Sequence, residues 1–514
     1  MFPECGCLIL DLIMNQRHYT QNQQMDDASC ELFRRLVLER TGMHFPPRRR
    51  DAMVRSVLAA AGRSGFEDIK EYYRCLSVSQ TNGKPWDELI QLLIINETYF
   101  FRDTPQMDAL SQHVLPEIIS RHRDDRRLRI WSAGCASGEE PYSLAMLLCQ
   151  ILPDIAQWNV FILGTDINKS DLLWAEKACY KERSFRVTDP LTRGRFFTPC
   201  DGGFELKPSI REMVHFAYLN LAEDVYPSLT TNTNAMDLIL FRNVAIYFEE
   251  VMMREMAFRL HRCLIPDGWF IAGAAEAGSA ICDPFIFWNF PGAILYRRGI
   301  APPHRPGIAV MPQDWASVPI MGRAKILDLL PVREEPARPV PPYPIPAPPR
   351  PPEQADPYRE GLIMLGKGNY EGAIERFQAR IAKDPKFVPA YCEIARAHAN
   401  RGRLKEASAW CEKAVKKDPL LAEAYYILAL IRQEEGKHGK AVELLKKTLY
   451  LVPDFLMAHF SLAVIHRQAG RRDEAMRHRS QALRLGARMP PDEILPGTDG
   501  MSSAQLLTMI EAMQ

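Results

Sequence analysis

Ile130-Trp-Ser-Ala-Gly-Cys-Ala-Ser-Gly-Glu-Glu-Pro-Tyr-Ser143 is the stretch that decides the fold of the central part of the chain. Its first residues are apolar, as in a buried strand, and its two glycines allow a sharp turn into a helix that begins around Pro141. Ser137 and Glu140 have the spacing of a capping box at the start of that helix. A glycine turn between a buried strand and a helix is typical of ligand-binding α/β sheets.

The residues of this turn restrict the ligand. The glycines have the spacing Gly134-x-x-x-Gly138, which does not meet the dinucleotide fingerprint. A pyrophosphate needs the positive end of a helix, and Glu139 and Glu140 would repel it there. S-adenosylmethionine instead carries an ammonium and a sulfonium, and carboxylates stabilise both cations. The turn therefore favours S-adenosylmethionine over NAD, and the alternative is a plain strand-to-helix connection without a ligand.

A second carboxylate follows the next predicted strand, in Gly164-Thr165-Asp166. At that point Asp166 can accept hydrogen bonds from both ribose hydroxyls of an adenosine. The alternative is that Asp166 caps the helix that starts near Lys169, and the two roles are compatible.

Outward from the turn, residues 128 to 299 alternate short apolar strands with helices. Near-continuous apolar strands between amphipathic helices predict a buried, mostly parallel sheet in a doubly wound, Rossmann-like α/β domain, which we place at residues 96–300. The expected strands are 128–131, 160–163, 238–240 and 269–272.

Residues 28–95 have helical periodicity and predict a small all-α domain after an irregular leader at 1–27. The loop Pro46-Pro47-Arg48-Arg49-Arg50 is basic. It is either a solvated surface or a docking surface for an acidic partner helix.

Residues 301–356 predict an extended, proline-rich linker. Between Pro331 and Pro357 there are 12 prolines in 27 positions, and proline removes an amide donor and fixes φ. Such a stretch forms neither helix nor sheet, so a semi-rigid polyproline spacer is expected.

Residues 357–490 contain an internal repeat with a period of 34 residues. Gly, Ala and Pro recur in register at this period, which predicts four tetratricopeptide repeats forming an α-helical solenoid. Ser502-x-x-Gln505 then opens a final amphipathic helix, within 491–514, that can cap the stack. The recurring residues are Gly368, Gly402, Gly436 and Gly470; Ala373, Ala407, Ala441 and Ala475; and Pro385, Pro419 and Pro453.

The composition excludes several classes of protein. Lys and Arg number 64 against 63 Asp and Glu, and a net charge of +1 argues against nucleic-acid or membrane-surface binding as the main role. The sequence contains no run of about 18 apolar residues, the length that a membrane-spanning helix needs. The 12 cysteines are scattered without a Cys-x-x-Cys pair, so we expect reduced thiols, no metal site and a cytoplasmic protein.

Five motifs follow one another in order and spacing, and they resemble those of the CheR-type chemotaxis protein-glutamate O-methyltransferases over roughly residues 28–298. The resemblance also covers the helical N-terminal domain and a tetratricopeptide extension known in some members. The motifs are Asn96-Glu-Thr-Tyr-Phe-Phe-Arg-Asp103, Gly138-Glu-Glu-Pro-Tyr-Ser143, Thr165-Asp166, Asn220-Leu221 and Phe241-Arg-Asn-Val-Ala-Ile-Tyr-Phe248.

The resemblance implies a set of site residues. Glu139 would hold the methionyl amine, Asp166 the ribose, and Arg102 and Tyr247 would be catalytic, although each of the last two has a purely structural alternative. Phe241 replaces a usual cysteine, and Gly273-Ala-Ala-Glu276 replaces a more common Gly-His-Ser-Glu. The implied cofactor-binding residues are Asn96, Thr98, Arg102, Gly134, Glu139, Asp166, Asn220, Leu221, Arg242 and Asn243.

By this resemblance the expected reaction is methyl transfer from S-adenosylmethionine to glutamates of a methyl-accepting chemotaxis receptor, which forms methyl esters. The repeats would bind a protein or peptide partner in their concave face or regulate the catalytic domain. Related enzymes use a small β insertion to bind a receptor's C-terminal pentapeptide. The interval from Tyr180 to Asn220 is short, though 204–207 and 214–216 can form a hairpin, so we predict weak or no pentapeptide dependence.

Two other functions fit parts of the pattern. A methyltransferase acting on a small molecule or RNA would share the cofactor residues, but it leaves the basic helical domain without a role. A non-catalytic scaffold would use the repeats and merely sense the cofactor, and the intact Arg102, Asp166 and Tyr247 argue against it.

Overall fold

The computed structural model describes residues 25–79, 83–94, 97–299 and 356–513. Asn96, most of the expected leader and nearly all of the expected linker lie outside these residues. The described parts up to Gly299 and from Pro357 belong to one compact unit.

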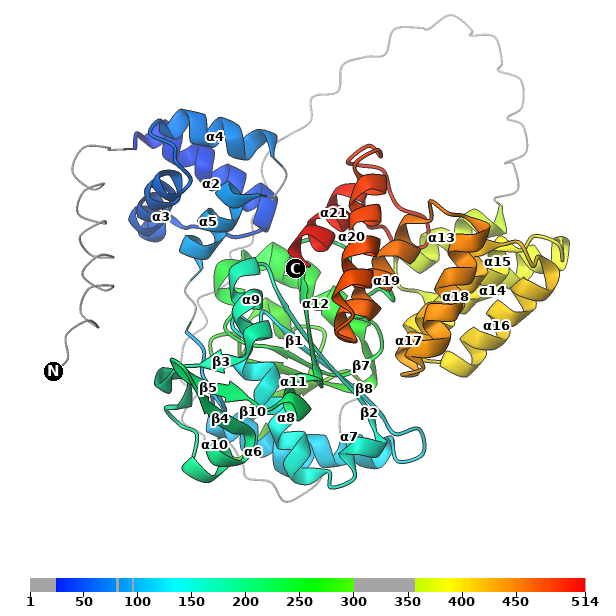
Figure 1. Ribbon diagram of the computed structural model, residues 1–514, viewed down its shortest axis with the longest axis horizontal. Coiled ribbons are helices and arrows are strands. Elements are labelled where there is room, and N and C mark those ends of the chain that lie inside the picture. Colours follow the sequence, from blue (N-terminus) through cyan, green and yellow to red (C-terminus); the bar gives the residue numbers. More distant parts are fainter. Residues whose placement is uncertain (1–24, 80–82, 95–96, 300–355, 514) are drawn as a thin grey trace, which may run out of the picture. The chain divides into compact units, whose positions relative to one another are not determined.

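The N-terminal part is a helical bundle, drawn in blue in Figure 1. It consists of α2 (Asp27–Thr41), α3 (Arg50–Arg63), α4 (Ile69–Val78) and α5 (Lys84–Leu93). Asp26 caps α2, and Gly42 ends it with a φ of 72°. Phe33, Val57 and Trp86 are fully or almost fully buried in the shared core, which confirms the all-α prediction.

The central sheet has seven strands in the order β6-β2-β1-β7-β8-β10-β9. The first five run parallel, and β10 is antiparallel to both β8 and β9. All seven residues of β1 are buried, including the polar Arg127, Arg129 and Ser132. The strands are β1 (Arg127–Ala133), β2 (Asn159–Asp166), β6 (Val214–Tyr218), β7 (Met236–Phe241), β8 (Leu264–Ala272), β9 (Ile286–Phe290) and β10 (Ala293–Arg297).

Helices connect these strands and complete the α/β fold. The strand order reverses between β1 and β7, which is the point where open α/β sheets bind their ligands. The helices are α6 (Thr104–Ala109), α7 (Leu115–Arg121), α8 (Glu139–Ile151), α9 (Lys169–Lys177), α10 (Pro190–Phe196), α11 (Pro208–Arg211) and α12 (Glu250–Cys263).

The interval between Tyr180 and Asn220 corrects one expectation. A separate three-stranded sheet, in the order β3-β5-β4, is formed by β3 (Cys179–Tyr180), β4 (Phe197–Cys200) and β5 (Gly203–Leu206). The predicted hairpin of 204–207 with 214–216 is wrong, because β5 pairs with β3 and β4 while β6 pairs with β2. The interval is therefore long enough for a small β insertion.

The repeats form eight helices in antiparallel pairs, drawn in yellow to red in Figure 1. In each repeat the periodic glycine joins the two helices with a φ between 69° and 74°, a conformation that glycine adopts without strain. The helices are α13 (Pro357–Gly366), α14 (Tyr370–Lys383), α15 (Pro389–Asn400), α16 (Leu404–Lys417), α17 (Ala422–Glu434), α18 (His438–Leu451), α19 (Leu456–Gln468) and α20 (Arg472–Gly486).

A last helix, α21 (Ser503–Ala512), follows the repeats and packs on α20. Ser502 and Gln505 form the capping box that their spacing predicts. Leu506 and Ile510 are buried.

The repeats also contact the sheet domain through buried polar groups. Asn234 donates to the carboxylate of Glu434 at 2.6 Å, and Asn159 donates to the Glu434 carbonyl at 2.9 Å. Arg127 and Arg129 lie 3.5 and 3.8 Å from the same carboxylate, whose side chain is 1% exposed. The end of α17 is therefore held against β1 and the segment before β7.

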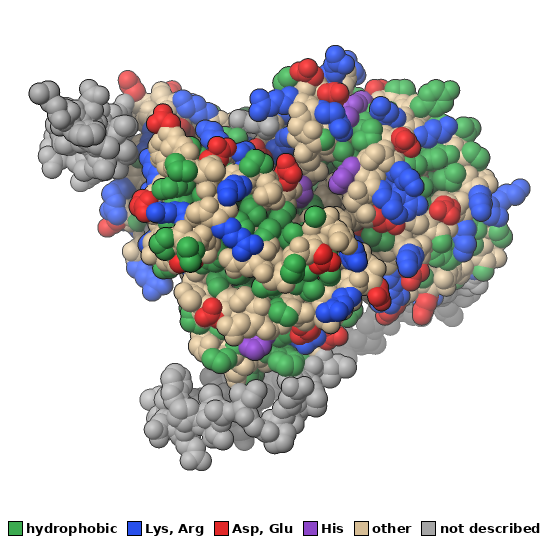
Figure 2. All heavy atoms as spheres, turned by 60° about the horizontal axis from the view of Figure 1, so that its bottom comes forward, with side chains coloured by type: hydrophobic (Ala, Val, Ile, Leu, Met, Phe, Trp, Pro, Cys, Tyr) green, Lys and Arg blue, Asp and Glu red, His purple; other side chains and the backbone are tan. Residues whose placement is uncertain are grey.

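Basic and acidic side chains are interspersed over the face drawn in Figure 2, in keeping with the net charge of +1. Within the described residues, no helix is both long enough and apolar enough to cross a membrane.

Candidate active site

A cavity of about 230 Å³ lies at the carboxyl ends of β1, β2 and β7. Residues from the helical bundle, among them Thr41 and Met43, also line it. It brings together nine of the residues predicted from the sequence: Thr98, Arg102, Gly134, Asp166, Asn220, Leu221, Arg242, Asn243 and Tyr247.

The turn after β1 takes its shape from Gly134. Its φ is 79°, and its amide donates to the Thr165 carbonyl at 2.8 Å. A Cβ on Gly134 would lie 2.4 Å from a methyl carbon of Val244, so only glycine lets the two loops approach this closely. The predicted capping box is wrong, because Gly138 is the N-cap of α8 and has no side chain to accept a hydrogen bond.

The two adjacent glutamates at the start of α8 point in different directions. Glu139 is 3% exposed and accepts hydrogen bonds from Ser137 at 2.7 Å and Ser184 at 3.0 Å. Burial raises its pKa. Glu140 lines the cavity, and Glu139 is not among the lining residues. Of these two glutamates, Glu140 is the one whose side chain lines the cavity.

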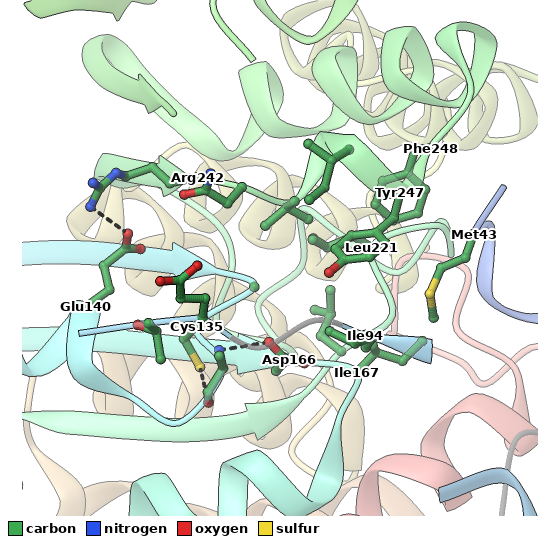
Figure 3. Close-up of a pocket in the computed structure, with 18 of the residues that line it drawn as sticks. Met43, Ile94, Cys135, Glu140, Asp166, Ile167, Leu221, Arg242, Tyr247 and Phe248 are labelled. Atoms are coloured by element: carbon green, nitrogen blue, oxygen red, sulfur yellow. Dashed lines mark hydrogen bonds and ion pairs between the residues drawn. The ribbon is translucent and has the colours of Figure 1, made fainter. Parts of the chain in front are cut away.

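Glu140 belongs to a hydrogen-bonded group that crosses the site. It accepts from Ser132 at 2.7 Å and from Arg242 at 3.1 Å. The other end of the Arg242 guanidinium donates to the Arg102 carbonyl at 2.7 Å. Figure 3 shows the Glu140–Arg242 pair on one side of the pocket and Tyr247 on the other. Arg242 thus fixes both the carboxylate and the backbone of the loop that carries Arg102.

Asp166 is held by backbone amides at the end of β2. Its carboxylate accepts from Ala136 at 2.9 Å and from Asn168 at 2.8 Å. Burial raises its pKa, and these amides oppose the rise because they stabilise the charged form. The helix α9 is capped by Asn168 and not by Asp166, so the alternative role as N-cap is wrong.

Asn220 joins the cavity to the helical bundle. Its amide nitrogen donates to the Arg40 carbonyl at 3.0 Å and to Glu223 at 3.2 Å. Tyr247 is linked to the same bundle, because its carbonyl accepts from the His44 amide at 2.7 Å. The guanidinium of Arg49 lies 5.8 Å from the centre of the Tyr247 ring. The basic loop of the bundle therefore borders the site.

Arg102 donates to the Glu97 carbonyl, and its guanidinium lies 5.7 Å from the centre of the Tyr99 ring. Phe101 and Asp103 have φ values of 55° and 66°, and this left-handed backbone is costly for Phe101, whereas Asp103 adopts it more readily as the N-cap of α6. Strained residues of this kind gather at functional sites.

Glu276 is a residue whose role the sequence did not predict. It is fully buried, and its carboxylate accepts from the Val244 and Ala245 amides at 2.8 and 3.2 Å. A Cβ on Gly273 would lie 2.4 Å from the same carboxylate. The segment Gly273-Ala-Ala-Glu276 therefore holds the loop that carries Arg242, Asn243 and Tyr247.

The residues of the site fit S-adenosylmethionine. Glu140 and Asp166 supply carboxylates for its cations and its ribose, while Ile94, Ile167 and Leu221 supply apolar surface. Among the described residues, no cluster of three or more His, Cys, Asp or Glu side chains is arranged to hold a metal ion.

Comparison with known proteins identifies the two domains that precede the repeats. Residues 96–290 match the model of the CheR methyltransferase SAM-binding domain, and residues 28–94 match the CheR methyltransferase all-alpha domain. Residues 364–431 and 422–455 match tetratricopeptide repeat models.

Several curated relatives are similar over about half of this chain and nearly all of their own length. "Chemotaxis protein methyltransferase 2" of Vibrio cholerae is 31% identical over 53% of this chain and 92% of the relative. "Chemotaxis protein methyltransferase 1" of Pseudomonas aeruginosa is 32% identical over 53% and 98%. The Escherichia coli chemotaxis protein methyltransferase is 30% identical over 53% and 90%. The chain therefore belongs to the CheR family of chemotaxis protein methyltransferases and is an S-adenosylmethionine-dependent methyltransferase that carries tetratricopeptide repeats.

Proposed function

We propose that this methyltransferase acts in the cytoplasm and esterifies glutamate side chains of a methyl-accepting chemotaxis receptor. The observation that supports this most is the cavity itself. It has carboxylates on one side, Tyr247 on the other, and a border formed by a basic loop of the helical bundle.

The cofactor-binding roles follow from the direction of each side chain. S-adenosylmethionine supplies a methyl carbon bonded to a cationic sulfur. Glu140 faces the cavity and takes the role that the family resemblance gives to Glu139, next to the cationic methionyl end. Asp166 accepts from the ribose, and Leu221 and Ile167 pack against the adenosine.

The acceptor needs no general base. A glutamate has a reference pKa of about 4.3, so it is already an anion at neutral pH. Its oxygen forms the new bond to the methyl carbon while the carbon–sulfur bond breaks and its electron pair stays on sulfur. Arg102 and Tyr247 orient the acceptor, and the apolar walls exclude water, which would stabilise the separated charges. Good alignment can contribute about 7–11 kcal/mol.

The basic loop suits an acidic partner. Arg48 is exposed, and Arg49 lies against Tyr247, so a helix that presents glutamates to the cavity would meet both cations. Weak dependence on a receptor pentapeptide stays a prediction, although the small sheet β3-β5-β4 removes the argument that the interval is too short.

For the repeats, the contacts favour regulation of the catalytic domain over a free adaptor. Helices α15 and α17 are buried along most of their length. Arg396 of α15 pairs with Asp499 at 3.8 Å, and Glu434 of α17 is held by Asn234. Residues from outside the repeats thus occupy part of the surface of α15 and α17.

The direct test is transfer of a labelled methyl group from S-adenosylmethionine to purified receptors. We expect label that is released by mild base, as a methyl ester is. Arg102→Ala should abolish transfer, while Arg254→Ala, which removes an exposed arginine of α12 paired with Glu250 and Asp283, should leave it unchanged. Wild-type turnover of Arg102→Ala would contradict the assignment of Arg102.

The same experiment separates the other two functions. Label in a small product or in RNA, with none in receptor protein, would favour a different methyltransferase. Calorimetric binding of S-adenosylhomocysteine without turnover on any receptor would favour a scaffold that senses the cofactor.

A further inference from the structure

Two cysteines of the small sheet face each other across its middle strand. Cys179 of β3 pairs with Glu205 of β5, and Cys200 of β4 pairs with Gly203 of β5. Their Sγ atoms are 2.8 Å apart. Both are free thiols and both are only half-buried. Six of the ten cysteines that the structure describes are instead buried, where solutes cannot reach them.

We propose that Cys179 and Cys200 are a reversible thiol–disulfide site that reacts with low-molecular-weight disulfides such as oxidised glutathione. The thiolate of one cysteine attacks a glutathione sulfur and releases one glutathione thiolate, which leaves a mixed disulfide on the protein. The second cysteine, as thiolate, attacks the protein sulfur and releases the second glutathione thiolate. The two thiol protons pass to the released thiolates.

The exchange transfers two electrons from the protein to glutathione disulfide. Two protein thiols are oxidised to one disulfide, and one glutathione disulfide is reduced to two thiols. The geometry favours the second step over a lasting mixed disulfide, because the two sulfur atoms already lie next to each other.

The surroundings set the conditions for the exchange. The hydrogen bond with Cys200 raises the pKa of Cys179 to about 11, and partial burial and Glu205 add to the effect. A thiol with such a pKa attacks slowly at neutral pH, so the exchange should be faster in mildly alkaline solution.

The site also lies beside the cofactor turn. Tyr180, next to Cys179, donates its hydroxyl to the Ser137 carbonyl at 2.8 Å. Ser184, four residues further on, donates to Glu139 at 3.0 Å. A disulfide would therefore restrain the strand that contacts the turn between β1 and α8.

Peptide mapping of the full-length protein tests the proposal. The protein is incubated with oxidised glutathione at mildly alkaline pH, the remaining thiols are blocked with N-ethylmaleimide, and trypsin is added. Cleavage after Lys177, Lys181, Arg195 and Arg211 places the two cysteines in peptides 178–181 and 196–211. We expect these two peptides to be joined, lighter than their sum by two hydrogen atoms, and separated by dithiothreitol.

The variants make the result specific. Cys179→Ser should abolish the joined peptides and leave glutathione on Cys200, whereas Cys149→Ser, at another half-buried cysteine, should leave the cross-link intact. Maleimide on both Cys179 and Cys200 in the wild-type protein, or separate glutathione on each without a cross-link, would overturn the proposal. The wild-type map decides even if a variant fails to fold.

Discussion

Glu276 holds the catalytic loop through backbone amides, so its removal should impair catalysis more than cofactor binding. Glu276→Ala leaves the Val244 and Ala245 amides without a partner inside the protein. A displacement of about 1 Å at Tyr247 is enough to lower kcat about 100-fold. Glu276→Gln keeps an acceptor oxygen and should retain most activity.

Steady-state kinetics together with the affinity for S-adenosylhomocysteine test this positioning role. The expected pattern is a lowered kcat in Glu276→Ala, little change in affinity, and rescue by glutamine. Equal losses in the alanine and glutamine variants would mean that the charge matters and that loop positioning is not the cause.

The adjacent glutamates of α8 offer a matched pair of substitutions. Glu140→Gln removes the carboxylate that lines the cavity, and hydrogen bonds to charged groups contribute about 1.5–3 kcal/mol. Its affinity for S-adenosylmethionine should fall by roughly 10-fold to 100-fold. Glu139→Gln can still bond to Ser137 and Ser184, so it should bind nearly as the wild type does. Calorimetry that gave the reverse order would restore Glu139 to the role suggested by the family resemblance.

At this scale the sequence predicted which residues gather at the site but not the direction in which each one points. Choosing between Glu139 and Glu140 depends on the rotation of α8 about its axis. That rotation is set by Gly138, with a φ of 90°, and by Ser184, which comes from a distant segment. Glu276 was missed for a similar reason, because its partners are backbone amides that any residue carries.

Among the secondary-structure elements, α7 and β7 are joined through His122. Its ring nitrogens lie 2.7 Å from Asp237 and 2.9 Å from Asp125. Burial alone would lower the pKa of His122, but the hydrogen bonds and charges of the two aspartates outweigh burial and raise it.

The raised pKa gives the stability of the protein a defined pH dependence. Protonated His122 stabilises the folded state fully below its ordinary value of 6.5, and this contribution is lost as pH rises through the higher folded pKa. Burial lowers the pKa of His215 and His261 to about 4, so these residues stay neutral throughout that window. Urea unfolding between pH 6 and 9 should show a decline in the wild type that is smaller in His122→Asn. An identical decline in both proteins would contradict the role of His122.

The elements themselves were predictable where the pattern is local. The strands β1, β2, β7 and β8 and the repeat helices follow from apolar runs and from a period of 34 residues. The pairing of β6 with β2 was not predictable from the sequence. The two strands lie about 50 residues apart, and the alternating burial of β6 also suits a strand of a hairpin.

At the scale of the whole molecule, the buried carboxylate of Glu434 connects the repeats to the sheet domain, and a single substitution can remove this contact. Glu434→Ala would leave Arg127 and Arg129 facing each other without the carboxylate that lies between them, and Asn234 without its acceptor. Breaking a buried ion pair in this way costs about 3–5 kcal/mol, mostly because the remaining charges stay buried without a partner. Glu434→Gln keeps the oxygen that accepts from Asn234 and should lose less.

Urea unfolding followed by circular dichroism, with limited proteolysis of the native protein, measures this contact. The control is Glu412→Ala, because Glu412 is 56% exposed and lies 3.7 Å from Arg432 within the repeats. An exposed pair of this kind contributes at most about 1 kcal/mol. If the contact couples the two parts, Glu434→Ala lowers the unfolding midpoint and speeds cleavage on both sides of the linker, while Glu412→Ala changes neither. An unchanged midpoint in Glu434→Ala would mean that this contact does not couple the repeats to the catalytic domain, and the regulatory role proposed for the repeats would then lose this support.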